Sequence, residues 1–150
     1  HALQANDCPA ALLQLEITES SIMNQIEQAS ATMHRLTALG VELAIDDFGT
    51  GYSSLSQLKR FPVSKLKIDR GFINDLPTNA NEDILVDAII TLANKLGLRS
   101  VAEGVETEAQ VALLKKSGCT EYQGYLFSRP CTPDDFVAFV RKRNAGLGQA

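Results

Sequence analysis

A strand followed by a helix recurs along the chain, and this repeat restricts the possible folds more than any other feature. In each strand segment, apolar and polar residues alternate with the period of an extended chain. The expected strands are Leu12–Ile17, Val41–Asp46, Lys65–Ile68, Arg99–Ala102 and Glu121–Gln123. Strands that alternate with helices pair in parallel through right-handed crossovers. We therefore expect five parallel strands, adjacent in chain order.

Helices are expected after the first four strands and near the end of the chain. They cover Gln25–Leu39, Ser54–Phe61, Glu82–Leu96, the segment from Thr107 to Gly118, and a last helix that begins at Thr132. Thr107 and Gln110 have the spacing of a capping box. The apolar period of the third helix predicts that its buried residues are Ile84, Leu85, Ala88, Ile89 and Leu92. The tail after Arg143 is expected to lack regular structure.

Polar side chains occur at or near the carboxyl ends of all five expected strands. They are Glu16, Asp46, Asp47, Lys67, Asp69, Glu103 and Gln123. The central strands of an open, doubly wound sheet are nearly all apolar, because helices cover both faces. Charged residues on one face instead favour strands that line the mouth of a TIM-like (β/α) barrel, where the chemistry is found at the carboxyl ends. We therefore predict an α/β fold with about five of the eight units of such a barrel.

Two adjacent carboxylates, Asp46 and Asp47, end the second strand and precede a loop that contains Gly49 and Gly51. Glycine lets a ligand or metal ion approach the backbone closely. Adjacent strand residues point to opposite faces, so the two acids should have different roles unless the strand ends between them. An isolated Asp-Asp-x-Gly sequence is more often a helix cap and turn. The set of polar strand ends favours a functional site.

Composition narrows the choice of partners. The 150 residues are 45% hydrophobic and 21% charged, as is typical of one globular domain. The net charge of −4, without a basic block, argues against a nucleic-acid polymer as partner, whereas a small phosphorylated ligand bound through metal ions is compatible with it. Cys8, Cys119 and Cys131 lack paired metal-ligand spacing and indicate reduced thiols, which favours a cytoplasmic location. Segments outside this sequence could still tether the protein to a membrane.

Five motifs together resemble the EAL-domain family, whose members are bacterial phosphodiesterases that hydrolyse cyclic di-GMP. The motifs are Leu15–Ser20 (LEITES), Asp46–Leu55 (DDFGTGYSSL), Lys67–Asp69 (KID), Ala102–Thr107 (AEGVET) and Gln123–Tyr125 (QGY). Their order and spacing match the family across nearly the whole chain. The resemblance implies a TIM-like barrel, two divalent cations (Mg²⁺ or Mn²⁺) in its mouth, and hydrolysis of cyclic di-GMP to linear pGpG.

The resemblance also implies a role for each motif residue. The implied metal ligands are Glu16, Asp46, Asp47 and Glu103, the implied catalytic residues are Lys67, Glu103 and Asp47, the implied contacts to substrate or water are Gln123, Glu106 and Tyr125, and Glu19 would steady the loop after Asp47. Carboxylate ligands suit Mg²⁺ or Mn²⁺ better than Zn²⁺, and two such ions suit phosphodiester hydrolysis. Lys67, beside several carboxylates, should stay charged.

Some of these residues have plainer alternatives. Lys67 and Asp69 could form a salt pair at a strand end, Glu106 could favour a helix N-terminus through the helix dipole, and Gln123 could bond within its own loop.

The Glu-Ala-Leu triplet that names the family does not occur in the sequence, nor does the family's asparagine ligand before Glu16. We therefore expect residues 1–150 to be the carboxyl-terminal part of one such domain, with 1–10 ending a preceding helix or loop and 144–150 forming a tail. Such a segment should be inactive alone.

The alternative to a metal-dependent phosphodiesterase is a non-catalytic cyclic di-GMP receptor or regulatory module. Open barrel edges predict a homodimer or another association, and sensor or GGDEF-type domains are expected upstream.

Overall fold

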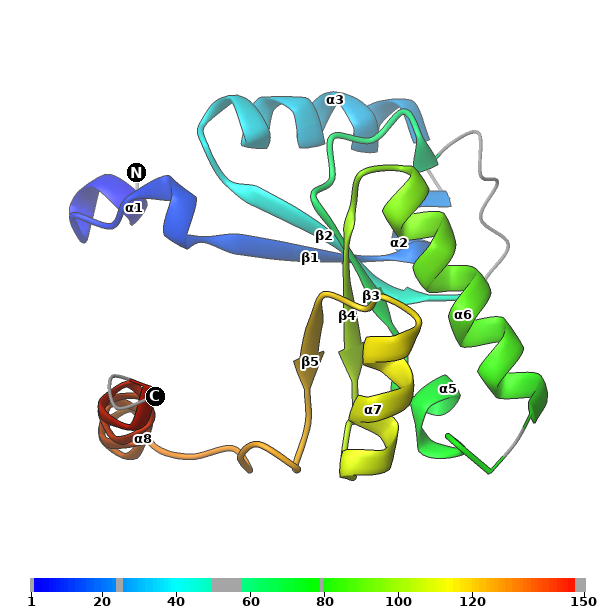
Figure 1. The fold of residues 1–150 in the computed structure, drawn as a ribbon. Helices are drawn as coiled ribbons and strands as arrows, with labels where there is room; N and C mark the ends of the chain where they lie inside the picture. The colour runs from blue at the N-terminus through cyan, green and yellow to red at the C-terminus, as the bar shows by residue number, and fades with distance from the viewer. Residues whose placement is uncertain (1, 24–25, 50–57, 79, 148–150) are drawn as a thin grey trace.

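Five parallel strands form one open sheet in the order β1-β2-β3-β4-β5 (Figure 1). The computed structural model describes residues 2–23, 26–49, 58–78 and 80–147. The strands are β1 (Gln14–Thr18), β2 (Glu42–Phe48), β3 (Lys65–Ile68), β4 (Arg99–Glu103) and β5 (Glu121–Gln123). Each strand pairs in parallel with the next along the chain, so the predicted arrangement is confirmed. The bounds of β3 and β5 are as predicted, β4 differs by one residue at its end, and β1 and β2 differ by one or two residues at both ends.

The described helices are α1 (Ala2–Ala5), the 3₁₀ turn η1 (Ala10–Leu12), α2 (Glu19–Met23), α3 (Ile26–Ala38), α5 (Arg70–Asn74), α6 (Ala80–Lys95), α7 (Glu108–Lys116) and α8 (Pro133–Leu147). The sequence did not predict α2 or α5, because a helix of five residues is too short to show a period. The first half of the predicted helix at Ser54–Phe61, residues 54–57, lies outside the described residues, and of the second half only Leu58 is helical. The expectation of an unstructured tail is wrong for residues 144–147, since α8 continues to Leu147.

The predicted capping box of α7 is confirmed. Thr107 Oγ1 accepts a hydrogen bond from Gln110 N at 3.2 Å, and Gln110 Oε1 accepts one from Thr107 N at 2.9 Å. At α8, Thr132 Oγ1 likewise accepts a bond from Asp135 N at 3.3 Å. None of the described helices combines the length and the apolar composition that crossing a membrane requires.

The hydrophobic core lies between one face of the sheet and the helices α3, α6 and α7, whereas α8 lies apart from the sheet, beyond β5 (Figure 1). Buried strand residues include Leu43, Ile45, Leu66 and Ile68, and they pack against Met33, Val86, Ile90 and Leu114 of the helices. The opposite face of the sheet carries the polar residues at alternate positions, as the strand period requires. This face positions the candidate site.

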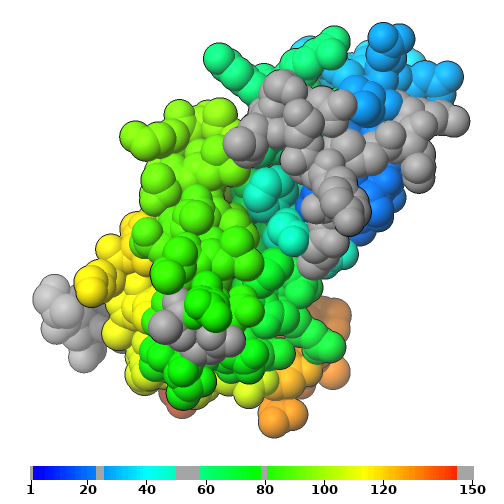
Figure 2. Space-filling view, turned by 90° about the vertical axis from the view of Figure 1, so that its right-hand side faces the viewer, coloured from blue at the N-terminus to red at the C-terminus, as the bar shows by residue number. Residues whose placement is uncertain are grey.

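Helix α6 turns a different side to the core than the sequence predicted. Its buried residues are Val86, Ile89, Ile90 and Ala93, while Ile84 is 70% exposed and Leu85 is 42% exposed. The prediction is also wrong for Ala88, which is exposed, and Leu92 is half-buried. The cause is that α6 carries apolar residues on more than one side, so two helical stripes fit the same sequence. Figure 2 shows this helix (green) at the surface beside α7 (yellow).

Strand β2 contains one extra residue near its carboxyl end. Ile45 pairs with Leu66 and Phe48 pairs with Ile68, so two residues of β2, Asp46 and Asp47, stand opposite the single residue between those partners. Asp47 adopts φ = 54°, a left-handed conformation that aspartate tolerates better than most residues. This bulge shifts the alternation, so that Phe48 joins Ile45 in the core. The two acids therefore do not diverge as adjacent strand residues normally would.

Candidate functional site

Lys67, on the central strand β3, is surrounded by carboxylates from three other strands. Its Nζ lies 2.6 Å from Glu16 Oε2 on β1, 3.0 Å from Asp46 Oδ1 on β2 and 2.7 Å from Glu103 Oε1 on β4. Burial by itself would lower the pKa of Lys67, but the hydrogen bonds to Glu103, Glu16 and Asp46 outweigh burial and raise this pKa well above its ordinary value. Lys67 is therefore an ammonium at neutral pH.

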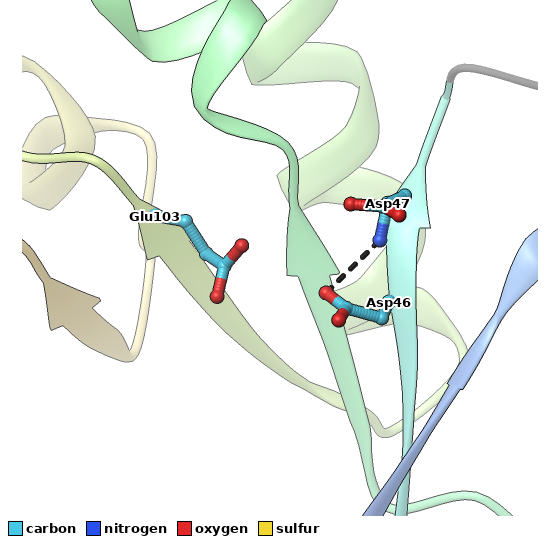
Figure 3. Close-up of side chains that lie close together, drawn as sticks. All are labelled: Asp46, Asp47 and Glu103. Atoms are coloured by element: carbon cyan, nitrogen blue, oxygen red, sulfur yellow. Dashed lines mark hydrogen bonds between the residues drawn. The ribbon is translucent and has the colours of Figure 1, made fainter.

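Asp46, Asp47 and Glu103 form a compact group of carboxylates. One oxygen of each lies within 4.8 Å of the other two. Figure 3 shows Glu103 on β4 and the two aspartates on β2, with their carboxylates turned towards each other across β3. The β2 bulge is what brings Asp47 to the side of Asp46, whose Oδ1 accepts a hydrogen bond from Asp47 N at 3.0 Å. Glu16 is not in this group and joins it through Lys67.

We call Glu16, Asp46, Asp47, Glu103 and Lys67 the acid cluster. It contains four carboxylates but a single ammonium, so acids outnumber bases within it by four to one. Closely spaced, partly buried charges of one sign are costly unless a cation joins them. Oxygen ligands with this spacing and charge suit a hard divalent cation such as Mg²⁺ or Mn²⁺. The residues present therefore fit the predicted metal.

Glu19 begins α2 and reaches the loop that follows the two aspartates. Its Oε2 accepts a hydrogen bond from Gly49 N at 3.0 Å, and the residue is only 2% exposed. Gly49 has φ = 99°, and a Cβ there would lie 2.9 Å from the ring of Phe72. The backbone after β2 is thus held by Glu19 and closely approached by Phe72. The contact agrees with the predicted supporting position of Glu19, while its role stays a prediction.

A pocket of about 450 Å³ adjoins the acid cluster at Glu103. Glu106, Gln123 and Tyr125, the three predicted contacts to substrate or water, all line it. Gln123 O accepts a hydrogen bond from Val105 N at 3.0 Å, and a Cβ on the next residue, Gly124, would collide with the Val105 backbone. Glycine is therefore needed where the loop after β5 passes close to Val105.

Sequence reasoning missed two polar residues of this pocket, Arg70 and Asn74 of α5. The available signal was a charged residue directly after the Lys67–Asp69 motif, at the carboxyl end of a strand. Asp69 itself points elsewhere, because its Oδ1 caps α5 by accepting a hydrogen bond from Gly71 N at 2.8 Å. The described contacts thus show Asp69 as a helix cap and not as a salt-bridge partner of Lys67.

A family model described as EAL domain matches residues 1–130. The cyclic di-GMP phosphodiesterase NbdA of Pseudomonas aeruginosa is 51% identical over 141 residues, which are 94% of this chain and 18% of NbdA. MucR of the same species, named a bifunctional diguanylate cyclase/cyclic di-GMP phosphodiesterase, is 46% identical over 140 residues, 93% of this chain and 20% of MucR. The chain thus spans about a fifth of the length of these curated relatives.

Solved structures of related proteins also superpose on the chain. The PaMucR phosphodiesterase in complex with c-di-GMP superposes with a TM-score of 0.87 at 47% identity, over 90% of this chain and 55% of that one. BlrP1 of Klebsiella pneumoniae, solved in calcium/cy-diGMP and manganese/cy-diGMP complexes, superposes with a TM-score of 0.80 at 36% identity, over 87% of this chain and 33% of that one.

Proposed function

Because the chain belongs to the EAL domain family, we propose that the protein containing it hydrolyses cyclic di-GMP to linear pGpG at the acid cluster. The five strands are then part of the TIM-like barrel that EAL domains have, as the sequence predicted. The observation that carries the proposal is the close grouping of four carboxylates around one ammonium at or near the carboxyl ends of four adjacent strands. In such barrels the reaction takes place at this end.

Four carboxylates of the acid cluster would hold the cations, two in a complete site. They are Glu16, Asp46, Asp47 and Glu103. Bound Mg²⁺ or Mn²⁺ would supply an activated water and would neutralise charge on the phosphodiester. The β2 bulge contributes by placing two ligands from adjacent positions on one side of a strand. The cation complexes of BlrP1 with cyclic di-GMP support this use of the site.

Lys67 would stabilise negative charge on the reacting phosphate. Its ammonium has three N–H donors, and three carboxylates lie within 3.0 Å of Nζ. A phosphate oxygen can therefore bind Lys67 only by replacing one of these partners. The pocket next to Glu103, with Glu106, Gln123 and Tyr125 in its wall, would take the part of the substrate beyond the reacting phosphate. Glu19 would act indirectly, by positioning the loop after the aspartates.

We further propose that the chain forms the carboxyl-terminal part of one EAL-type domain. Among the described strands, β1 and β5 each pair on one side, whereas a barrel has no open edge. Further strands of the same protein, or a second copy, would cover these edges, because unpaired edges recruit partners. A GGDEF-type domain upstream is supported by MucR, which is named as a diguanylate cyclase as well.

The test is hydrolysis of cyclic di-GMP by the full-length protein, with pGpG measured by chromatography. We expect turnover with Mg²⁺ or Mn²⁺ and its loss with EDTA, whereas the isolated 150 residues should show little activity. Undiminished turnover in EDTA would contradict the role of the acid cluster. Binding of cyclic di-GMP without hydrolysis in either metal would instead identify a receptor.

A further inference from the structure

Helix α5 presents two polar residues to the pocket beside the acid cluster. Arg70 and Asn74 are four positions apart, so they lie on the same side of the helix, and both line the pocket. Glu103 belongs both to the acid cluster and to the wall of this pocket. Arg70 therefore lies beside the site where the reacting phosphate would be held.

The guanidinium of Arg70 is not engaged by any described carboxylate. The ion pairs between described residues are made by Lys65, Lys67 and Arg99. This is notable because two acids, Glu103 and Glu106, line the same pocket. Arg70 is thus a cation that faces a polar pocket and has its donors available for a ligand.

The stem of Arg70 is nevertheless closely packed. Gly104 adopts φ = 72°, and a Cβ at this position would lie 2.6 Å from Arg70 Cβ. The backbone that follows Glu103 therefore passes directly against the Arg70 side chain. Asp69, the preceding residue, caps α5 and fixes where the helix begins. This packing restricts the aliphatic part of the Arg70 side chain. The guanidinium is then the part of the side chain that can contact a ligand.

We infer that Arg70 binds the phosphodiester of cyclic di-GMP that is not being cleaved, an inference that rests on the proposed function. The substrate carries two anionic phosphodiesters, and the acid cluster with its cations would hold only one of them. Lys67 is occupied by its carboxylates, and Arg70 is the cation among the residues that line the adjoining pocket. A guanidinium matches two phosphate oxygens with parallel hydrogen bonds. Asn74 offers an amide donor on the same side.

The test compares Arg70→Gln with the unchanged full-length protein by calorimetric binding of cyclic di-GMP in Ca²⁺, the ion present in one BlrP1 complex. We expect the dissociation constant to rise on the order of 10- to 100-fold, the usual effect of losing hydrogen bonds to a charged group. Arg70→Lys keeps the charge but not the paired N–H donors of the guanidinium. Its dissociation constant should therefore lie between those of Arg70→Gln and the unchanged protein. Arg141→Gln, an exposed arginine of α8, is the matched control and should bind as the unchanged protein does.

An analogue of cyclic di-GMP shows which group of the substrate Arg70 contacts. In cyclic di-GMP with one neutral methylphosphonate linkage, the charge that Arg70 would hold is removed. The unchanged protein and Arg70→Gln should then bind this analogue equally. A difference that persists in full on the analogue would assign Arg70 to a base and overturn the inference.

The two proposals fail in different ways. Equal affinity of both proteins for cyclic di-GMP would overturn the role of Arg70, while hydrolysis by the unchanged protein would still stand. If the unchanged protein neither bound nor hydrolysed cyclic di-GMP, the proposed function would fall, and the inference with it.

Discussion

Two groups of charged residues lie at opposite ends of the same sheet face. At the carboxyl ends of the strands is the acid cluster. At the amino ends is a second group, Glu42, Lys65, Arg99 and Glu121, which we call the amino-end network. Lys65 Nζ lies 2.9 Å from Glu121, and Arg99 lies 2.8 Å from Glu42 and 3.4 Å from Glu121. Both groups consist of acids and bases from adjacent strands.

The strand period places the two groups on one face. Lys65 and Lys67 are two positions apart on β3, and Arg99 and Glu103 are four apart on β4. A thin layer separates the two ends, since Ala44 on β2 and Val101 on β4 occupy the positions between them and are buried. The two groups therefore lie on the same face of adjacent strands, and their positions differ mainly in the strand end at which they lie.

The groups differ in charge balance. The amino-end network has two acids and two bases, each of them in an ion pair, so it compensates its own charge. The acid cluster has four acids and one base. We therefore expect charged residues on a sheet face to form a ligand site where acids outnumber bases, and a structural network where the two are equal in number. This difference can be tested residue by residue.

The largest effect is expected from Asp46→Asn. Neutralising this proposed metal ligand should lower the rate of pGpG formation more than about 100-fold, which exceeds the loss of about 10- to 100-fold that is usual for residues that only support metal ligands. Asparagine keeps the oxygen that accepts from Asp47 N and removes one of the four negative charges, while Lys67 keeps Glu16 and Glu103 as partners. Without divalent ions, the melting temperature should therefore not fall. Retained Mg²⁺-dependent turnover would show that Asp46 takes no part in the reaction.

The paired substitutions Lys67→Met and Lys65→Met test charge balance directly. Removing Lys67, which is 5% exposed, leaves four carboxylates without an ammonium and should cost about 3 kcal/mol of unfolding free energy in EDTA. Mg²⁺ should restore much of this loss, because the ion replaces the missing charge.

Lys65→Met should behave differently. Its partner Glu121 is 37% exposed, so we expect a loss of about 1 kcal/mol that Mg²⁺ does not restore. Denaturant titrations with and without Mg²⁺ measure both variants. An equal response to Mg²⁺ would refute the distinction between the two ends.

Glu19→Ala should have a smaller effect on activity, about tenfold, because Glu19 acts through the loop after β2. Alanine removes the acceptor for Gly49 N, whereas Glu19→Gln retains an oxygen that can accept this bond. Steady-state rates should therefore be nearly normal for the glutamine variant. If glutamine were as harmful as alanine, the carboxylate charge and not the loop contact would be what matters.

The sequence predicted the strand order well because strand segments alternate with helical segments along the chain, and such units pair in parallel with their neighbours. The prediction of buried residues failed where one apolar pattern is compatible with two different buried sides of a helix. In α6, the stripe through Ile84, Ala88 and Leu92 and the stripe through Val86, Ile90 and Ala93 are both apolar, and only packing against the sheet selects the second. Periodicity is a local property, whereas the buried side of a helix depends on the neighbouring elements.

Site residues divide in the same way. Residues in recognisable motifs, such as Asp46 and Glu103, were predicted and lie together. The bulge at Asp47 was not, because the extra residue appears only when β2 is aligned with β3. Arg70 was missed because its place in the pocket depends on α5, a helix too short for periodicity to reveal. The sequence thus predicted the pocket residues that lie in motifs at strand ends, but not those on the short helix α5.

The smallest effect is expected from Glu42→Gln, four positions before Asp46 on the same face of β2. Glu42 pairs with Arg99 at 2.8 Å, but their side chains are 40% and 44% exposed, so water and salt screen the interaction. Arg99 also keeps its second partner, Glu121. We therefore expect a loss below about 1 kcal/mol, a fall in melting temperature of a few degrees at most, and an unchanged rate of pGpG formation. Calorimetry and the chromatographic assay on the same preparation measure both. A large fall in activity with normal stability would mean that the amino-end network influences the acid cluster through the layer of Ala44 and Val101, and that the two ends do not act independently.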